Sequence, residues 1–209
     1  MKISEIFTSV QGEGLYQGTT ALFIRTSGCT RKCTFCDTQY HTKGEDVLNE
    51  DIIEKINTLK PDTVIFTGGE PLLFLSDILY IIISSKYGTK FHLETNGDLI
   101  KTIDDYKIVV DAFDYVAVSP KCLEVARRID ILKNEVKINS SITDIKVVTN
   151  LRSVGLELLP YATTLMPLTV YNKKKDAETR IAVWNYCIEH KLHFSARLHV
   201  LVFGKKRGI

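Results

Sequence analysis

Three cysteines stand in one eight-residue stretch of the chain, Cys29-Thr-Arg-Lys-Cys33-Thr-Phe-Cys36. Thiolates at this spacing in a loop can ligate three irons of a [4Fe–4S] cluster and leave the fourth iron open to a substrate or cofactor. A structural zinc site normally closes with a fourth protein ligand, and the nearby candidate is His41, five residues beyond Cys36. The spacing alone therefore allows both a cluster and a zinc site.

The whole-chain composition is that of an ordinary globular protein. The 209 residues are 44% hydrophobic and 25% charged, with a formal net charge of +2. This balance indicates neither a nucleic-acid partner nor an anionic membrane, and the longest apolar run, residues 77–83, is too short to span a bilayer. The first residues lack a signal pattern, and five cysteines with three clustered suit a metal site in a reducing compartment. We expect one cytoplasmic domain over residues 1–209.

Strand-like runs alternate with helical patterns along most of the chain, which predicts an α/β fold with a mostly parallel sheet. The expected strands cover residues 21–25, 63–67, 90–94, 115–119, 144–149, 163–166 and 195–203. The expected helices cover residues 48–59, with Asn49 as N-cap, 74–87, and a late helix that begins at Asp176 and has Ile181, Trp184, Ile188 and Leu192 on its apolar face.

Small and polar residues gather where the expected strands end, at 27–28, 67–69, 94–97 and 119–121. In barrel-type α/β folds this edge of the sheet carries the active site, so an enzyme is the leading class. Eight full strand–helix units usually need roughly 250 residues. We therefore expect an open or partial barrel.

The cysteine spacing, followed by a strand that ends in Gly68-Gly69-Glu70-Pro71, resembles the radical S-adenosylmethionine (SAM) superfamily. The resemblance implies that Cys29, Cys33 and Cys36 hold a [4Fe–4S] cluster whose open iron binds SAM. Two glycines let a backbone come close to a ligand, because no Cβ is in the way. The implied SAM contacts are Phe35, Cys36, Asp37, Gly68, Gly69, Glu70, Ser119, Pro120 and Lys121. Either motif alone is a weak signal, and their combination in this order carries the prediction.

A narrower resemblance, to the 7-carboxy-7-deazaguanine synthase family of the queuosine pathway, extends over nearly the whole chain. Its most discriminating segment is Gln11-Gly12-Glu13-Gly14, ahead of the cysteines. The other matching segments are residues 5–10, 23–25, 28–29, 36–38, 67–71, 94–97, 119–121 and 206–208. The substrate contacts that the resemblance implies are Val10, Gln11, Gly12, Glu13, Arg25, Thr67 and Ile209.

The resemblance implies conversion of 6-carboxy-5,6,7,8-tetrahydropterin to 7-carboxy-7-deazaguanine with release of ammonia, started by a 5′-deoxyadenosyl radical. Arg25 is the candidate for the substrate carboxylate, because a guanidinium binds carboxylates bidentately. Thr38 matches the family position that ligates Mg²⁺, a cation that prefers oxygen ligands. The family also implies a homodimer and an electron donor such as flavodoxin or ferredoxin.

One position departs from the family pattern, since Met166 precedes Pro167 where the family commonly has a Gln-Pro pair that touches SAM. Two alternatives stay open. A glycyl-radical-activating enzyme shares the cysteine spacing and Gly-Gly-Glu-Pro but acts on a protein. A zinc-stabilised binding module is the non-enzyme alternative. His92, Cys122 and Cys187 are interpreted as structural residues, with His92 as a satisfied core histidine.

Overall fold

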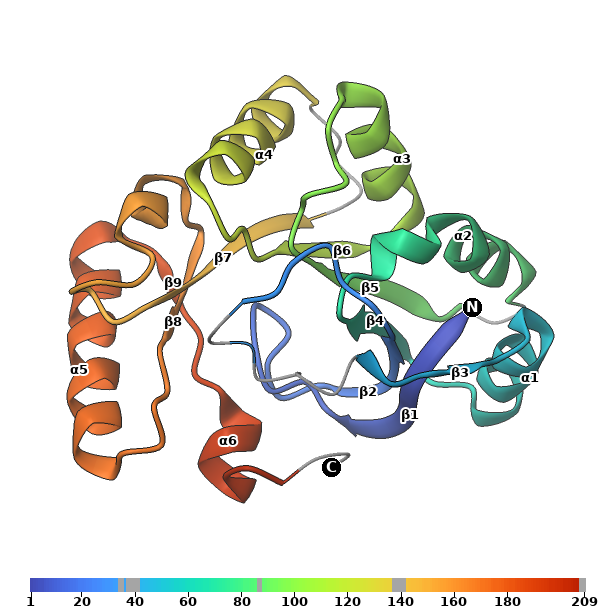
Figure 1. Cartoon of the computed structure of the whole chain (residues 1–209), viewed down its shortest axis with the longest axis horizontal. Helices are drawn as coiled ribbons and strands as arrows, with labels where there is room; N and C mark the ends of the chain where they lie inside the picture. Colours follow the sequence, from blue (N-terminus) through green and yellow to red (C-terminus); the bar gives the residue numbers. More distant parts are fainter. Residues whose placement is uncertain (34–35, 37–41, 86–87, 137–141, 207–209) are drawn as a thin grey trace.

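The structure is a computed structural model that describes residues 1–33, 36, 42–85, 88–136 and 142–206 (Figure 1). Its strands form one curved sheet in the order β3-β1-β2-β4-β5-β6-β7-β8-β9. From β2 to β9 neighbouring strands are parallel, while β1 is antiparallel to β2 and β3. The strands are β1 Lys2–Val10, β2 Thr20–Thr26, β3 Glu45–Asp46, β4 Thr63–Gly68, β5 Lys90–Thr95, β6 Tyr115–Val118, β7 Ile142–Thr149, β8 Thr164–Pro167 and β9 His193–Phe194.

Five helices lie along the convex face of the sheet, and a sixth, α6, lies on its open side (Figure 1). The helices are α1 Asn49–Leu59, α2 Leu75–Ser84, α3 Ile103–Ala112, α4 Leu123–Glu135, α5 Lys173–His190 and α6 Leu198–Phe203, with the 3₁₀ turns η2 Pro71–Phe74 and η3 Leu156–Tyr161. This arrangement confirms the prediction of an open or partial α/β barrel. Within the described ranges, none of these helices has the length and apolar character needed to cross a membrane.

The two faces of the sheet have different chemistry, because successive side chains of a strand point to opposite faces. The face toward the helices is apolar, and its buried residues include Leu22, Ile24, Val64, Phe66, Leu93, Val116 and Ile145, packed with Ile52, Ile78 and Ile129 from the helices. The intervening positions turn to the concave face, where Ala21, Phe23 and Ile65 form a small apolar cluster. The polar residues of that face are Arg25, Thr67, His92, Glu94, Tyr115, Asp144 and Lys146. The sequence therefore builds the main core on one side of the sheet and a surface rich in polar groups on the other.

The predicted strand over residues 195–203 is wrong. The structure ends the sheet with β9, His193–Phe194, and then forms helix α6. The reason is a contact far away in sequence: the Leu198 N–H donates to the Gly12 carbonyl at 2.9 Å, and Arg197 pairs with Glu13 at 3.2 Å. These bonds draw the chain from the edge of the sheet toward the β1–β2 loop.

The residues predicted to begin two of the helices are also wrong. Leu48, without a side-chain bond, is the N-cap of α1, while the Asn49 amide donates to Asp77 at 2.7 Å. Asn172 caps α5, and Asp176 is buried in its first turn, where it accepts from the Val170 N–H.

The predicted apolar face of α5 is the exposed one. Ile181, Trp184 and Ile188 are each more than half exposed, whereas Val183 and Cys187 are buried. The smaller side chains of Val183 and Cys187 face the sheet, and Cys187 lies close enough to β9 to contact the His193 carbonyl at 3.7 Å. Trp184 covers part of Phe194 in an edge-on contact, with ring centroids 5.0 Å apart.

Helix α4 offers a test of this packing. Ile129 is the test position, and Ile131, two residues later, is the internal control. Ile129 is fully buried against the sheet, and Ile131 is 48% exposed. Ile129→Ala should lower the free energy of unfolding by about 2–5 kcal/mol, because it leaves a cavity in the core. Ile131→Ala should change it by no more than about 0.5 kcal/mol. Urea unfolding measures both, and equal losses would contradict the assigned face of α4.

Candidate active site

The cysteine loop starts at the end of β2 and is held by backbone bonds to the glycines that end β4. The Gly69 N–H donates to the Thr26 carbonyl at 3.2 Å, and the Glu70 N–H donates to the Gly28 carbonyl at 2.9 Å. A Cβ added to Gly69 would lie 1.7 Å from the Gly28 oxygen. Glycine is therefore required at position 69 by the approach of two backbones, before any ligand is considered.

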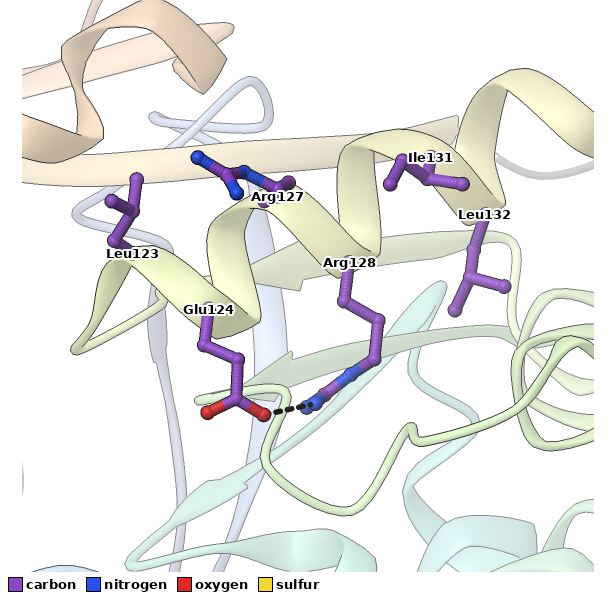
Figure 2. Close-up of a pocket in the computed structure, with 6 residues that line it drawn as sticks. All are labelled: Leu123, Glu124, Arg127, Arg128, Ile131 and Leu132. Carbon is purple, nitrogen blue, oxygen red and sulfur yellow. Dashed lines mark hydrogen bonds and ion pairs between the residues drawn. The ribbon is translucent and has the colours of Figure 1, made fainter.

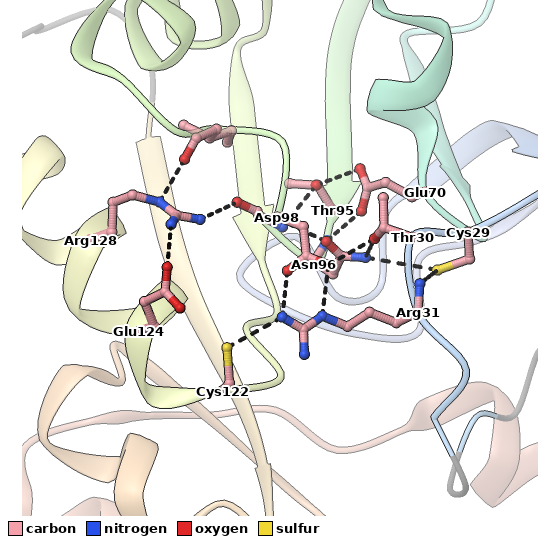
Figure 3. A network of polar contacts seen from close by, with 12 residues as sticks. Cys29, Thr30, Arg31, Glu70, Thr95, Asn96, Asp98, Cys122, Glu124 and Arg128 are labelled. Atoms are coloured by element: carbon pink, nitrogen blue, oxygen red, sulfur yellow. Dashed lines mark hydrogen bonds and ion pairs between the residues drawn. The ribbon is translucent and has the colours of Figure 1, made fainter.

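The carboxylate of Glu70 is fully buried and joins β4 to the loop after β5. It accepts hydrogen bonds from the Thr95 hydroxyl at 2.6 Å, the Asn96 N–H at 2.8 Å and the Leu72 N–H at 3.1 Å (Figure 3). Burial raises the pKa of Glu70 to about 7, against the opposing effect of these three donors. Glu70 thus organises two strand ends through contacts within the chain alone.

A second polar network, shown in Figure 3, ties the cysteine loop to the loops that follow β5 and β6. The Asn96 amide donates to the Thr30 hydroxyl at 2.9 Å. Arg31 forms a bidentate pair with Asp98, at 2.7 and 2.6 Å, and also donates to the Cys122 sulfur at 3.2 Å. Cys122, interpreted from sequence as structural, is therefore one of the groups that position Arg31.

The three cysteines of the loop are free thiols, each partly exposed. Two N–H donors point to the Cys29 sulfur, from the Arg31 backbone at 3.4 Å and the Asn96 side chain at 3.8 Å. Three thiols in one loop and donors toward a sulfur are what a cluster-ligating thiolate requires, so the donor set fits a [4Fe–4S] cluster. In the part of the chain that the structure describes, no three His, Cys, Asp or Glu side chains converge closely enough to hold a metal ion.

The concave face carries a network of buried charges. Lys146 of β7 pairs with Glu94 of β5 at 2.6 Å and with Glu13 of the β1–β2 loop at 3.0 Å. Glu13 also pairs with Arg197 at 3.2 Å and lies 4.0 Å from His199. These cations outweigh the effect of burial and lower the pKa of Glu13. For Glu94 burial dominates and raises the pKa, with Lys146 opposing it.

Gln11 connects the predicted substrate segment to this network, because its amide donates to Glu94 at 3.1 Å. Val10 is exposed, and the Gly12 carbonyl accepts from Leu198. A Cβ on Gly12 would lie 2.3 Å from the His199 ring. The β1–β2 loop is therefore folded onto the concave face by contacts with β5, β7 and the C-terminal segment.

Arg25 and Thr67 lie on neighbouring strands and are paired in register, β2 against β4. The Arg25 Nε donates to Glu5 at 2.7 Å, and its guanidinium lies 5.9 Å from the centre of the Phe7 ring. The structure thus places Arg25 on the concave side with an acidic partner. An incoming carboxylate would therefore have to share the guanidinium with Glu5 or replace Glu5.

Three more of the predicted SAM contacts, Ser119, Pro120 and Lys121, lie after β6. The Lys121 ammonium donates to the Ser119 hydroxyl at 2.9 Å, and Pro120 is buried. Met166, at the position of the family's Gln, is buried in β8. Phe35, Asp37, Thr38, His41 and Ile209 lie outside the described residues.

His92 is a core residue, but its ring is not satisfied as expected. Within the described residues neither ring nitrogen has a hydrogen-bond partner. The ring packs against Tyr16 and Tyr115, with centroids 4.5 and 5.2 Å away. Burial lowers the pKa of His92 to about 4, so the ring is neutral at physiological pH.

Two residues of the site, Lys146 and Arg197, were missed at the level of sequence, while Glu94 and Asn96 were noted only as part of segment 94–97, without a role. For Lys146 a signal was present, since it is a charged residue between Ile145 and Val147 of a strand. Such a residue at the alternate positions of a buried strand must face a polar interior or another charge.

Two further grooves lie outside the cysteine loop, and the second of them borders the concave face at Arg197. One, of about 470 Å³, runs along the outer flank of α4, where Glu124 pairs with Arg128 at 3.2 Å (Figure 2). The other, of about 490 Å³, is lined by residues after β8, in α5 and in α6, among them Arg180 and Arg197. Neither is lined by the cysteine loop or by Glu70.

The buried state of Glu70 predicts a pH-dependent stability. The pKa of the Glu70 carboxyl rises from 4.5 to about 7 on folding, so the folded protein binds the carboxyl proton more tightly than the unfolded chain does. The stability that results is greatest below pH 4.5 and is lost as the pH rises to about 7. Glu70→Gln should destabilise the protein at low pH, because an NH₂ group replaces one acceptor. The difference in the free energy of unfolding between wild type and Glu70→Gln should narrow by up to roughly 3 kcal/mol as the pH rises from 4.5 to about 7. Urea unfolding at several pH values measures it, with Glu124→Gln as an exposed control, and a constant difference would contradict the raised pKa.

Comparison with known proteins agrees with this geometry. Residues 23–181 match the model of the radical SAM superfamily. The chain is 36% identical over 195 residues to the 7-carboxy-7-deazaguanine synthase of Bacteroides thetaiotaomicron, covering 91% of this chain and 96% of that protein. It is 31% identical over 227 residues to the synthase of Hyperthermus butylicus, covering 97% and 92%.

Solved structures support the fold. The crystal structure of QueE from Escherichia coli matches with a TM-score of 0.54 and 19% identity, over 95% of this chain and 94% of that one. Streptococcus suis SuiB bound to S-adenosylmethionine matches with a TM-score of 0.57 and 16% identity, over 83% of this chain and 46% of that one. The sequence, over nearly its full length, places this chain in the 7-carboxy-7-deazaguanine synthase family of radical SAM enzymes.

Proposed function

We propose that this chain converts 6-carboxy-5,6,7,8-tetrahydropterin to 7-carboxy-7-deazaguanine with release of ammonia, as a single cytoplasmic radical SAM domain. The observation that carries the proposal is the position of the Gln11–Glu13 segment. This segment bonds to Glu94, and Glu94 is two residues from Asn96, which bonds to the cysteine loop. A polar face for a substrate and the cysteine loop are thereby joined through the end of β5.

The concave face has the chemistry that a carboxylated pterin needs. The pyrimidine side of a pterin presents N–H donors, for which the carboxylates of Glu13 and Glu94 are suitable acceptors. At the other end of the substrate, the Arg25 guanidinium is the group that would bind the carboxylate, with Thr67 on the adjacent strand. Val10, Gly12 and Ile209 complete the proposed substrate contacts.

Cys29, Cys33 and Cys36 would hold the [4Fe–4S] cluster, and SAM would contact Gly68, Gly69, Glu70, Ser119, Pro120 and Lys121, with Phe35, Cys36 and Asp37. When bound, these cofactors would supply the radical chemistry that the reaction needs. The residues of the chain position the two ligands: Glu70 and Asn96 fix the cysteine loop relative to β5, and the donors at Cys29 stabilise a thiolate.

Three further features belong to the proposal. Mg²⁺ would bind at Thr38 together with oxygen atoms of the substrate. Two copies of the chain would form a homodimer. A one-electron donor such as flavodoxin or ferredoxin would reduce the cluster.

An anaerobic turnover assay tests the reaction. We expect reduced, cluster-loaded protein with SAM, Mg²⁺ and carboxytetrahydropterin deuterated at C6 to form 7-carboxy-7-deazaguanine, identified by mass spectrometry, with deuterium appearing in SAM. Cys33→Ala is the control that should lack both the brown colour and the product. A colourless protein after anaerobic reconstitution would favour the zinc module. A brown protein that cleaves SAM without deuterium exchange would favour an activating enzyme with a protein substrate.

Arg25→Ala should weaken pterin binding by roughly 10- to 100-fold, because it removes a charge-assisted bond to the carboxylate, and should leave SAM binding within about twofold of wild type. Equilibrium titration of each ligand gives the two dissociation constants. Arg127→Ala, which removes an exposed guanidinium on α4, is the matched control and should change neither. Equal losses for both ligands in Arg25→Ala would argue against the carboxylate role.

A further inference from the structure

Lys146 lies behind the two carboxylates that it pairs. Its side chain is 3% exposed, while those of Glu94 and Glu13 are 16% and 21% exposed. Its neighbours along β7, Ile145 and Val147, belong to the core on the other face of the sheet. The carboxylates are therefore the groups that a ligand on the concave face would meet, and the ammonium is their common support.

The two carboxylates depend on this ammonium to different degrees. Glu13 also has Arg197 and His199 nearby. Among the described residues, Lys146 is the cation that pairs with Glu94, whose other bond is from the Gln11 amide. Without Lys146, burial would favour the protonated form of Glu94, and its carboxyl group would become a donor as well as an acceptor.

A buried ion pair of this kind is a poor device for stability alone, because apolar residues of similar volume often do as well. What the ion pair does instead is fix the charge and the orientation of the two carboxylates. Since a pterin presents adjacent N–H donors, the acceptor must stay ionised and must point toward them. We propose that Lys146 is a positioning residue of the pterin site, which holds Glu94 and Glu13 side by side as acceptors for the substrate. This inference rests on the proposed function.

The test uses the reconstituted protein and 6-carboxypterin, the fully oxidised and unreactive form of the substrate. We expect Lys146→Met to raise the dissociation constant for 6-carboxypterin by about tenfold or more and to leave that for SAM within about twofold. Tyr106→Phe is the matched control, because it removes a buried 2.8 Å bond to Thr143 of the same strand on the opposite face. It should change neither constant.

A double variant separates positioning from a purely structural role. Adding Glu94→Gln to Lys146→Met removes the carboxyl group that Lys146→Met leaves buried without its cation, so the melting temperature should recover in part while pterin binding stays weak. Since Glu13 keeps Arg197 and His199 in both variants, the double variant should bind 6-carboxypterin within about threefold of Glu94→Gln alone. That comparison holds even if Lys146→Met alone does not fold.

Several outcomes would overturn the inference: wild-type pterin affinity in Lys146→Met, equal losses for pterin and SAM, or a double variant that either regains wild-type affinity or binds far more weakly than Glu94→Gln. These outcomes leave the proposed function intact as long as wild-type protein binds 6-carboxypterin. If wild-type protein does not bind it, the proposed pterin substrate is wrong, and the inference is wrong with it.

Discussion

The close approach of two backbones, Thr26–Cys29 and Gly68–Glu70, is the constraint on which the cofactor side of the structure depends. Two N–H···O bonds and the missing Cβ of Gly69 bring the cysteine loop against the end of β4. Directly after these glycines, the buried Glu70 carboxylate extends the same arrangement to β5. Three donors from two segments converge on it, so a change in the position of one strand end is transmitted to the others. The loop that carries the cysteines is thereby placed by strands rather than by its own sequence.

Two buried carboxyl groups, those of Glu70 and Glu13, have pKa values shifted in opposite directions, and the difference lies in their partners. Glu70 is surrounded by neutral donors, and burial raises its pKa to about 7. Glu13 has Lys146, Arg197 and His199 nearby, and its pKa is lowered in spite of burial. A carboxyl group near neutrality can organise backbone N–H groups with little cost of charge burial, whereas a group that must accept from a ligand needs a cation behind it. The structure thus places Lys146 and Arg197 beside the Glu13 carboxylate, whereas neutral donors surround that of Glu70.

How far the sequence could predict this arrangement depended on the range of the interactions. The parallel strands and the gathering of polar loops at their carboxyl ends follow from local patterns, and both were predicted correctly. The segment 195–203 has strand-like composition, yet it forms a helix because Gly12 and Glu13, more than 180 residues earlier, bond to it. The prediction of which face of α5 is buried was wrong for a related reason. Periodicity shows that a helix has an apolar face, but the distance to the sheet decides which face packs. The pairing of Glu94 with Lys146 was not predicted, because each alone is an ordinary charged residue and their contact depends on the arrangement of β5 and β7 in the sheet.

The superfamily match covers the cysteine side of the candidate site and only part of its concave face. Residues 23–181 include the cysteine loop, Glu70, Asn96 and the loop after β6. The segments outside that range supply Gln11, Glu13, Arg197 and His199, which meet on the concave face. Since Gly12 packs directly against His199, the N-terminal loop and the C-terminal segment can only take their positions together. In the proposed function, the cofactor residues therefore all lie within the superfamily match, whereas the substrate site combines Arg25, Thr67 and Glu94 from that range with residues from the two ends of the chain.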